Sequence, residues 1–148
     1  MEETRREAPD MVVTGSIEVQ TKGHCDIVDV TQQLLAELAD SGLRNGNATL
    51  FVVGSTAGIT TIEHEPGLLE DFCNFWQRVA PEGVAYKHDA RWDESNGFSH
   101  VRASLLGPSL TIPFMEGRPA LGVWQQVVLV DFDHRPRHRE IVIQMIGE

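Results

Sequence analysis

The chain of 148 residues is 41% hydrophobic and 23% charged, and its formal net charge is −10. This length suits one domain with a hydrophobic core, and this composition is typical of an ordered protein and not of a disordered chain. The acidic balance argues against nucleic acid and anionic membranes as partners, because the field of the protein repels phosphate. A small phosphorylated molecule remains a candidate ligand wherever Arg, Lys or backbone N–H groups gather locally.

Cysteine usage and the N-terminus indicate the compartment. Cys25 and Cys73 are far apart and lie among apolar residues, and small disulfide-stapled domains carry more cysteines. We therefore expect free thiols in a reducing compartment rather than a disulfide. Residues 1–10 lack the apolar core of a signal peptide, and no apolar run is long enough to span a membrane. A cytoplasmic protein is expected, with a flexible N-terminal arm at 1–10 and a single domain at 11–148.

The first part of the chain predicts two strands and a helix. Alternating apolar residues indicate a strand over 11–21, and a second strand is expected over 25–30. A helix follows, with Asp29 or Thr31 as its N-cap and Gly42 at its end. Its expected buried stripe consists of Leu34, Leu35 and Leu38.

A central strand is expected over 48–53, and another strand over 59–62. Between them, the small residues 54–58 form either a simple bend or a place where a backbone or ligand approaches closely. Pro66 suits the first turn of a helix that ends at 81–83. The apolar positions of this helix recur at helical spacing, and we interpret them as core: Leu68, Leu69, Phe72, Trp76 and Val79.

The second half predicts a polar loop from 86 to 100, then one or two helical turns over 101–106 and a short strand over 110–114. The clearest strands are 122–132 and 139–146. Both carry apolar residues on both faces, as strands inside a sandwich or at an oligomer interface do. The expected fold class is α+β: antiparallel, sandwich-like sheets with two main helices.

The loop from 86 to 100 concentrates the functional chemistry of the chain. His88 and His100 lie in it with three carboxylates, an amide and two cations, and a loop that folds back could bring both rings to one cavity. With Glu63 or His64, the two histidines would supply ligands suited to zinc or another divalent ion. The alternative is that each histidine is an ordinary polar loop residue.

Acid–base catalysis and phosphate binding are further interpretations. Asp89 follows His88, although adjacent residues on a strand point to opposite faces and Asp89 need not orient the ring. Arg102 could hold a phosphate in a bidentate manner. The hydroxyls of Ser55, Thr56 and Ser104 and the backbone N–H groups of 54–58 could add contacts.

Trp124 and Gln125 stand beside a glycine at the start of a predicted strand. We interpret Trp124 as core, with Gln125 satisfying a buried polar group. The alternative is that Trp124 forms a pocket wall.

Several motifs together resemble the YjbQ-like proteins, also called the secondary thiamine-phosphate synthase family. They are G-S-T-A-G-I-T-T-I-E at 54–63, P-E-G at 81–83 with Y-K-H at 86–88, N-G-F-S-H-V-R-A-S-L-L-G-P-S-L-T-I-P at 96–113 and L-G-V-W-Q at 121–125. The last two are quite specific, and the match runs over nearly the whole chain.

The resemblance implies an α+β fold around a β-sandwich, a homotrimer, and a weak thiamine-phosphate synthase activity. That activity joins a pyrimidine pyrophosphate to a thiazole phosphate with loss of pyrophosphate. A divalent metal, zinc or magnesium, is a candidate cofactor. The polar positions of the family fall on Glu63, His88, Asn96, His100, Arg102, Trp124 and Gln125.

Two positions depart from the family pattern. Gly54 stands where many members have a histidine, which would be the natural third metal ligand. His64 could replace that histidine as a metal ligand, although it lies one strand end away. Val123 replaces the usual threonine of L-G-T-W-Q and removes a hydroxyl.

Three hypotheses follow. The first is an enzyme acting on a phosphorylated heterocycle, with His88, His100 and Glu63 as catalytic residues and with Asn96, Arg102, Ser55, Thr56, Trp124 and Gln125 binding substrate. In it, His88 and His100 are also the metal ligands. The second is a non-catalytic homotrimer that binds a metal or metabolite with the same residues. The third is an assembly factor that uses exposed edges.

Overall fold

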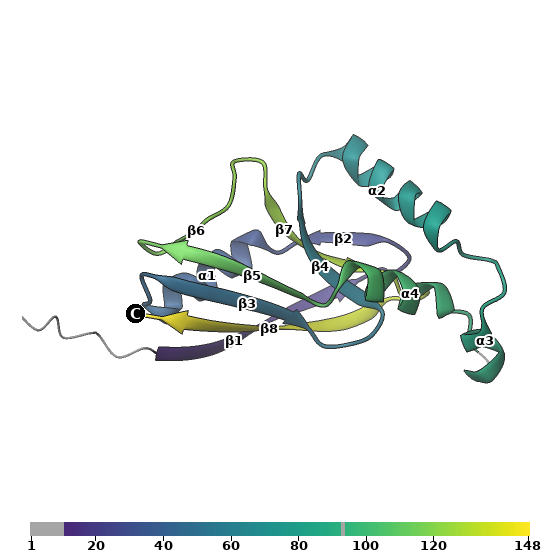
Figure 1. The fold of residues 1–148 in the computed structure, drawn as a ribbon, viewed down its shortest axis with the longest axis horizontal. Helices are drawn as coiled ribbons and strands as arrows, with labels where there is room; N and C mark the ends of the chain where they lie inside the picture. Colours follow the sequence, from purple (N-terminus) through teal and green to yellow (C-terminus); the bar gives the residue numbers. More distant parts are fainter. Residues whose placement is uncertain (1–10, 93) are drawn as a thin grey trace, which may run out of the picture.

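Two antiparallel sheets and four helices make up the computed structural model, which describes residues 11–92 and 94–148 (Figure 1). The expected arm at 1–10 lies outside the described residues. The larger sheet has the order β1 (Met11–Thr21), β8 (Arg137–Gly147), β3 (Gly46–Val52), β5 (Ser109–Met115) and β6 (Arg118–Pro119). The smaller sheet has the order β2 (Asp26–Asp29), β7 (Gln126–Asp131) and β4 (Ala57–Ile62). The predicted α+β class is confirmed.

β7 is buried on both faces and organises the packing. Val127 and Leu129 belong to the main core between the sheets, whereas Val128 and Val130 belong to a second cluster with side chains of α2 and α4. Because successive side chains of a strand point to opposite faces, a strand covered on both sides must be apolar throughout. The apolar character predicted for both faces of this strand is therefore explained by its position between two layers.

Helix α1 (Thr31–Ser41) packs on the main core. Leu34 and Leu38 are buried as predicted, but Leu35 is 37% exposed, so its place in the buried stripe is wrong. Asp29 accepts hydrogen bonds from the backbone N–H and the hydroxyl of Thr31. Gly42 ends the helix in the left-handed conformation, with φ of 70°, as glycine at this position readily does.

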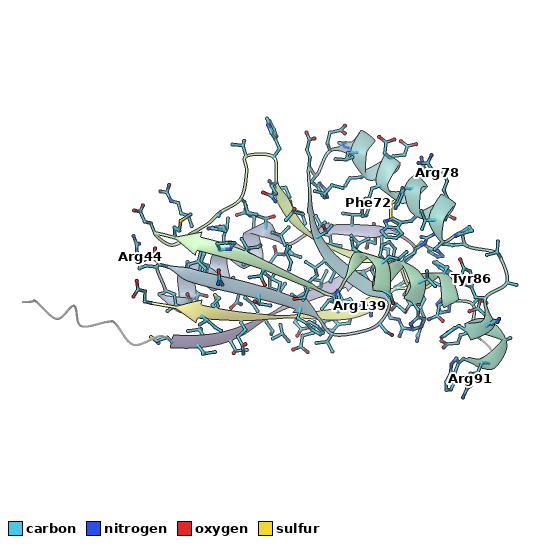
Figure 2. All side chains as sticks on the ribbon, viewed as in Figure 1. Arg44, Phe72, Arg78, Tyr86, Arg91 and Arg139 are labelled. Atoms are coloured by element: carbon cyan, nitrogen blue, oxygen red, sulfur yellow. A yellow bond between two sulfur atoms is a disulfide. The ribbon has the colours of Figure 1, made fainter. Side chains whose placement is uncertain are left out.

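Helix α2 (Pro66–Val79) begins at the predicted proline, and the side chain of Glu65 accepts the N–H groups of its first turn. Trp76 is its only fully buried residue. Val79 is 47% exposed, so its assignment to the core is wrong. Figure 2 shows Phe72 on the side of α2 that faces the small sheet, where it packs against the second cluster.

The segment expected to be a polar loop is largely helical. It contains α3 (Lys87–Trp92) and the start of α4 (Gly97–Leu106), which begins four residues before the predicted helical turns. The carboxylate of Asp89 accepts the N–H of Gly97 at 2.8 Å and so satisfies a backbone donor in the first turn of α4. This capping contact comes from another helix, and periodicity cannot reveal it.

The two cysteines form a disulfide, so the expectation of free thiols is wrong. Cys25 precedes β2 and Cys73 lies in α2, with 6.0 Å between their Cα atoms. The fold brings together two positions that are 48 residues apart, which cysteine counting could not anticipate. Within the described part of the chain, no helix is both long and apolar enough to cross a bilayer.

Replacing Leu129 by alanine should lower the free energy of unfolding by about 2–5 kcal/mol, because a fully buried side chain of β7 would leave a cavity. Urea unfolding followed by circular dichroism measures the change. The matched control is Leu105→Ala on α4, where the side chain is 61% exposed and the expected change is below about 0.5 kcal/mol. Equal losses in the two variants would contradict this account of the core.

Candidate functional site

The two histidines of the polar segment meet. His88 comes from α3 and His100 from α4, and their ring centroids lie 4.5 Å apart with the ring planes inclined at 39°. Both side chains are partly exposed, so solvent and a small ligand can reach them. The predicted convergence of these two residues is therefore present, although two helices and not a folded-back loop produce it.

Each ring is oriented by an outer contact. Nδ1 of His88 lies 3.2 Å from a carboxylate oxygen of Asp89, the same oxygen that accepts the N–H of Gly97. The ring of His100 lies beside the backbone of Ser55, in the connection between β3 and β4. On a strand, Asp89 would point away from His88 and need not orient the ring. The two residues lie instead on a helix.

Burial and the neighbouring imidazole of His88 lower the pKa of His100 below its ordinary value of about 6.5. The carboxylates of Asp133 and Glu94 act in the opposite direction but do not outweigh these effects. The ring of His100 is therefore neutral at pH 7 and carries a lone pair on one nitrogen. A neutral imidazole of this kind can accept a proton or bind a metal ion.

Beneath the rings lies a buried polar network centred on Asp133, which stands two residues after the end of β7 and is 1% exposed. Its carboxylate accepts hydrogen bonds from Thr56 at 3.0 Å and from Arg137 at 2.7 Å. It also accepts the backbone N–H of His134 at 2.7 Å and lies 2.7 Å from that ring. Burial by itself would raise the pKa of Asp133, but these hydrogen bonds outweigh it and hold the pKa well below its ordinary range.

Asp131 and Arg139 form a second ion pair in the same network. The guanidinium of Arg139 donates to both carboxylate oxygens of Asp131, at 2.7 and 3.0 Å, and to the hydroxyl of Thr56 at 2.6 Å. Figure 2 shows Arg139 inside the body of the molecule, near the connection between β3 and β4. Neither Asp131 nor Arg139 was among the residues predicted from the sequence to belong to the site. The sequence feature that could have revealed them is a pair of carboxylates at alternate positions at the end of an apolar strand.

Asn96 and Thr56, both predicted to bind substrate, belong to this network. The amide nitrogen of Asn96 donates to Asp133 at 3.4 Å, and its carbonyl oxygen is buried without a hydrogen-bond partner among the described residues. Thr56 uses its hydroxyl for Asp133 and Arg139, so that hydroxyl is not free for a ligand. Ser55 stays exposed beside a hollow of about 180 Å³ between the start of β4 and α4.

Arg102 is not placed to hold a phosphate. It is fully buried, its Nε donates to the carbonyl of Ala80 at 2.9 Å, and its guanidinium lies over the ring of Phe98 at 4.9 Å. The sequence position two residues after His100 suggested proximity to that ring. On a helix, however, residues two apart point in different directions, so Arg102 faces the interior.

The remaining predicted residues lie at the other end of β4. Glu63 and Trp124 line a hollow of about 500 Å³, and with Gln125 they line an adjoining one of about 390 Å³. Figure 1 shows the connection between β6 and β7 far from α3. Trp124 is 73% exposed, so its interpretation as core is wrong and the alternative of a pocket wall fits. Gln125 accepts the N–H of Gly122 and donates to the hydroxyl of Thr61, both at 3.0 Å.

Comparisons with known proteins identify the family. The family model described as UPF0047 protein YjbQ-like matches residues 15–148. This chain belongs to the YjbQ-like family. A UPF0047 protein of Methanocaldococcus jannaschii is 33% identical over 132 residues, which cover 88% of this chain and 92% of the relative. The UPF0047 protein YugU of Bacillus subtilis is 30% identical over 134 residues, covering 89% and 98%.

Solved structures support the same assignment. A YbjQ-like protein of unknown function from Sulfolobus solfataricus P2 superposes with a TM-score of 0.89 at 33% identity, covering 95% of this chain and all of the other. A hypothetical protein from Aeropyrum pernix K1 gives a TM-score of 0.86 at 32% identity, covering 92% and 99%. The family resemblance predicted from the motifs is confirmed.

The YjbQ-like chain has a physical reason for glycine at position 54. Gly54 adopts a φ of 138°, and a Cβ atom there would lie 2.8 Å from a guanidinium nitrogen of Arg139. A side chain at this position would therefore collide with the ion pair of the polar network. The described residues contain no group of three or more His, Cys, Asp or Glu side chains that could hold a metal ion. His64, the suggested substitute ligand, lines the hollow at the far end of β4.

Stability of this YjbQ-like chain should depend on Asp133 and on pH. Because the folded-state pKa lies below the ordinary value of 3.8, the ionised carboxylate stabilises the fold above pH 3.8, and this contribution is lost as the pH falls below it. Asp133→Asn should lower the free energy of unfolding by about 1–3 kcal/mol at pH 7, since the ionised acceptor shared by Thr56, Arg137 and the N–H of His134 loses its charge. The difference from wild type should shrink below pH 3.8.

Chemical unfolding at a series of pH values measures this dependence. The matched control is Asp40→Asn on the exposed side of α1, with an expected change below about 0.5 kcal/mol at each pH. A loss for Asp133→Asn that does not vary with pH would contradict the assigned charge state.

Proposed function

We propose that this YjbQ-like protein is an enzyme that acts on a small phosphorylated molecule at the His88–His100 pair. The observation that carries the proposal is the contact between two imidazoles from different helices, 4.5 Å apart between centroids, each with an outer contact that fixes its orientation. Oriented, partly exposed imidazoles are the usual proton carriers near neutral pH. His100 would accept the proton, and Asp89 would stabilise the charge on His88 when it is protonated.

The reaction that we propose is the one implied by the motifs, a weak thiamine-phosphate synthase activity. It joins a pyrimidine pyrophosphate to a thiazole phosphate and releases pyrophosphate. The leaving group needs positive charge, yet Arg102 is buried and the chain carries a net charge of −10. A divalent ion would supply that charge.

His88 and His100 fit half of such a metal site. Metal-binding histidines usually pass their other ring N–H to a carboxylate or a backbone carbonyl, and Asp89 and the backbone of Ser55 would take these two roles. Nitrogen ligands favour zinc over magnesium, which prefers oxygen. With two imidazoles as protein ligands, the remaining positions would be filled by water or by oxygens of the substrate.

The second candidate function is a non-catalytic protein that binds a metal ion or a metabolite. The separation of Glu63, Trp124 and Gln125 from the histidines favours it, because one chain does not bring the expected catalytic and substrate-binding residues to a single pocket. Binding at the histidine pair would then occur without turnover. Cytoplasmic location, expected from the sequence, stays a prediction for both functions.

Assay of the two thiamine precursors, with zinc or magnesium, tests the catalytic role. His88→Ala and His100→Ala should each lower turnover by about 100-fold or more, since each removes a proton carrier or metal ligand. The matched control is His138→Ala, a histidine on β8 that pairs with Glu18, and it should keep the wild-type rate. Equal background rates in all four proteins would rule out the synthase activity.

Zinc titration of the metal-free protein by calorimetry separates the two candidates. Wild type and His138→Ala should bind one zinc ion per chain, and both site variants should bind at least about tenfold more weakly. Zinc binding without turnover of either precursor would support the non-catalytic protein. No zinc binding by wild type would contradict the metal site in both.

We further propose that the protein assembles as the homotrimer implied by the family resemblance, through the outer face of the larger sheet. On this face, three rows of cross-strand neighbours on β1, β8, β3 and β5 form a patch that we call the uncharged face. None of the residues in these rows is charged, although 23% of the residues in the chain are. Charged residues are depleted at the centre of interfaces. The rows are Val12, Ile146, Asn47 and Pro113; Thr14, Gln144, Thr49 and Thr111; Ser16, Val142, Phe51 and Ser109.

Phe51→Glu should convert the trimer to monomers at micromolar concentration, because the change puts a charge on the uncharged face. Size-exclusion chromatography with light scattering gives the mass. Leu105→Glu, on exposed α4, is the matched control and should leave the mass unchanged. A wild-type monomer, or dissociation by Leu105→Glu alone, would contradict the assigned interface.

A further inference from the structure

Helix α2 has a small apolar attachment to the rest of the chain. Of its fourteen residues only Trp76 is fully buried, where its ring packs edge-on against Phe132 with 5.0 Å between centroids. Phe75 and Val79 are nearly half exposed. A helix of this length usually depends on a continuous packed face, so α2 needs other contacts to hold its position.

The disulfide supplies one of these contacts. It joins the middle of α2 to the residue just before β2. Both Cys25 and Cys73 are partly exposed, in contrast to cysteines sealed in a core. A thiol reagent in solution can therefore reach the bond, as exchange requires.

Arg102 joins the same two segments by hydrogen bonds. Its guanidinium donates to the carbonyl of His24, next to Cys25, at 3.4 Å, and to that of Ala80, just after α2, at 2.9 Å. Its remaining nitrogen is buried without a partner among the described residues. The hydrogen-bonded link is thus incomplete, and the covalent bond is the stronger of the two attachments.

α2 leads through a short connection into α3, the helix that carries His88. Residues 80–86 form the short connection from α2 to α3, and the hydroxyl of Tyr86 donates to the carbonyl of Pro81 at 2.8 Å within it. Figure 2 shows Tyr86 between α2 and α3. His100 belongs to α4, which packs on the smaller sheet. The contact between Asp89 and the N–H of Gly97 also joins α3 to α4, so movement of α2 separates the two imidazoles only when it breaks that contact as well.

We propose that Cys25 and Cys73 form a reversible redox latch on the histidine site. In the oxidised state, the disulfide holds α2 on the smaller sheet and keeps His88 beside His100. In the reduced state, α2 and α3 detach and the imidazole pair is lost. The effect of the latch on a ligand of the pair rests on the proposed function, whereas its effect on α2 does not.

The chemistry of the latch is thiol–disulfide exchange with a dithiol reductant. A thiolate of the reductant attacks one sulfur and forms a mixed disulfide, and the released cysteine takes up a proton. The second thiol of the reductant then displaces the other cysteine, which also becomes a thiol. Two electrons and two protons pass to the protein, and the reductant leaves as its own disulfide.

Hydrogen exchange followed by mass spectrometry tests the latch on the full chain. Oxidised wild type is compared with wild type reduced by dithiothreitol without denaturant and with Cys25→Ser/Cys73→Ser. Amides of 66–92 should exchange about tenfold faster or more in the reduced and double-variant proteins. Amides of β8 should be unchanged in all three, which shows that the fold persists, and dithiothreitol should not affect the double variant.

Zinc titration of oxidised wild type and of Cys25→Ser/Cys73→Ser, both without dithiothreitol because thiols bind zinc, tests the link to the site, with at least about tenfold weaker binding expected in the double variant. Equal exchange of 66–92 in the oxidised and reduced states would overturn the latch, as would a bond that dithiothreitol leaves intact. Absence of zinc binding in every state, together with faster exchange on reduction, would overturn the proposed metal site but not the latch. Equal zinc binding with and without the disulfide would overturn the coupling between the disulfide and the histidine site.

Discussion

The ion pairs of Asp131 and Asp133 are the interaction on which the rest of the structure depends. The two carboxylates stand at the end of β7, the strand buried between both layers, and are almost inaccessible to solvent. Their partners come from the turn before β4, from β8 and from the residue before α4. Because buried carboxylates are stable only when they are paired and hydrogen-bonded, these segments must meet at the end of β7.

This constraint places the candidate site. Thr56 is tied to both Asp133 and Arg139, which holds the neighbouring backbone of Ser55 where it contacts the ring of His100. Asn96 binds the same carboxylate and begins α4, so its contact sets where that helix starts. Buried polar pairs of this kind contribute less to net stability than to the choice of one arrangement over others, and here that arrangement is the orientation of His100.

The candidate functional residues divide into two groups along β4. The histidines, Ser55 and Asn96 lie near its start, and Glu63, Trp124 and Gln125 lie beyond its end, about 20 Å away for a strand of this length. Sequence motifs give the order of such residues but not their separation.

Residue periodicity and local signals determined much of this protein. The alternating strands, the helix that ends at Gly42 and the helix that begins at Pro66 all formed as predicted, because the signal for each, alternation or a helix-end residue, is contained in one stretch of chain. The order of motifs was enough to indicate the family.

Tertiary structure alone decided which polar side chains meet and which are buried. Arg102 went to the interior, Trp124 to the surface, and Cys25 met Cys73. Helix α3 and the first turn of α4 formed where a loop was expected, since Asp89 of one caps the other. These outcomes depend on contacts between residues that are distant in sequence. Such contacts become favourable only when the sheets have folded and excluded water from the network around Asp133.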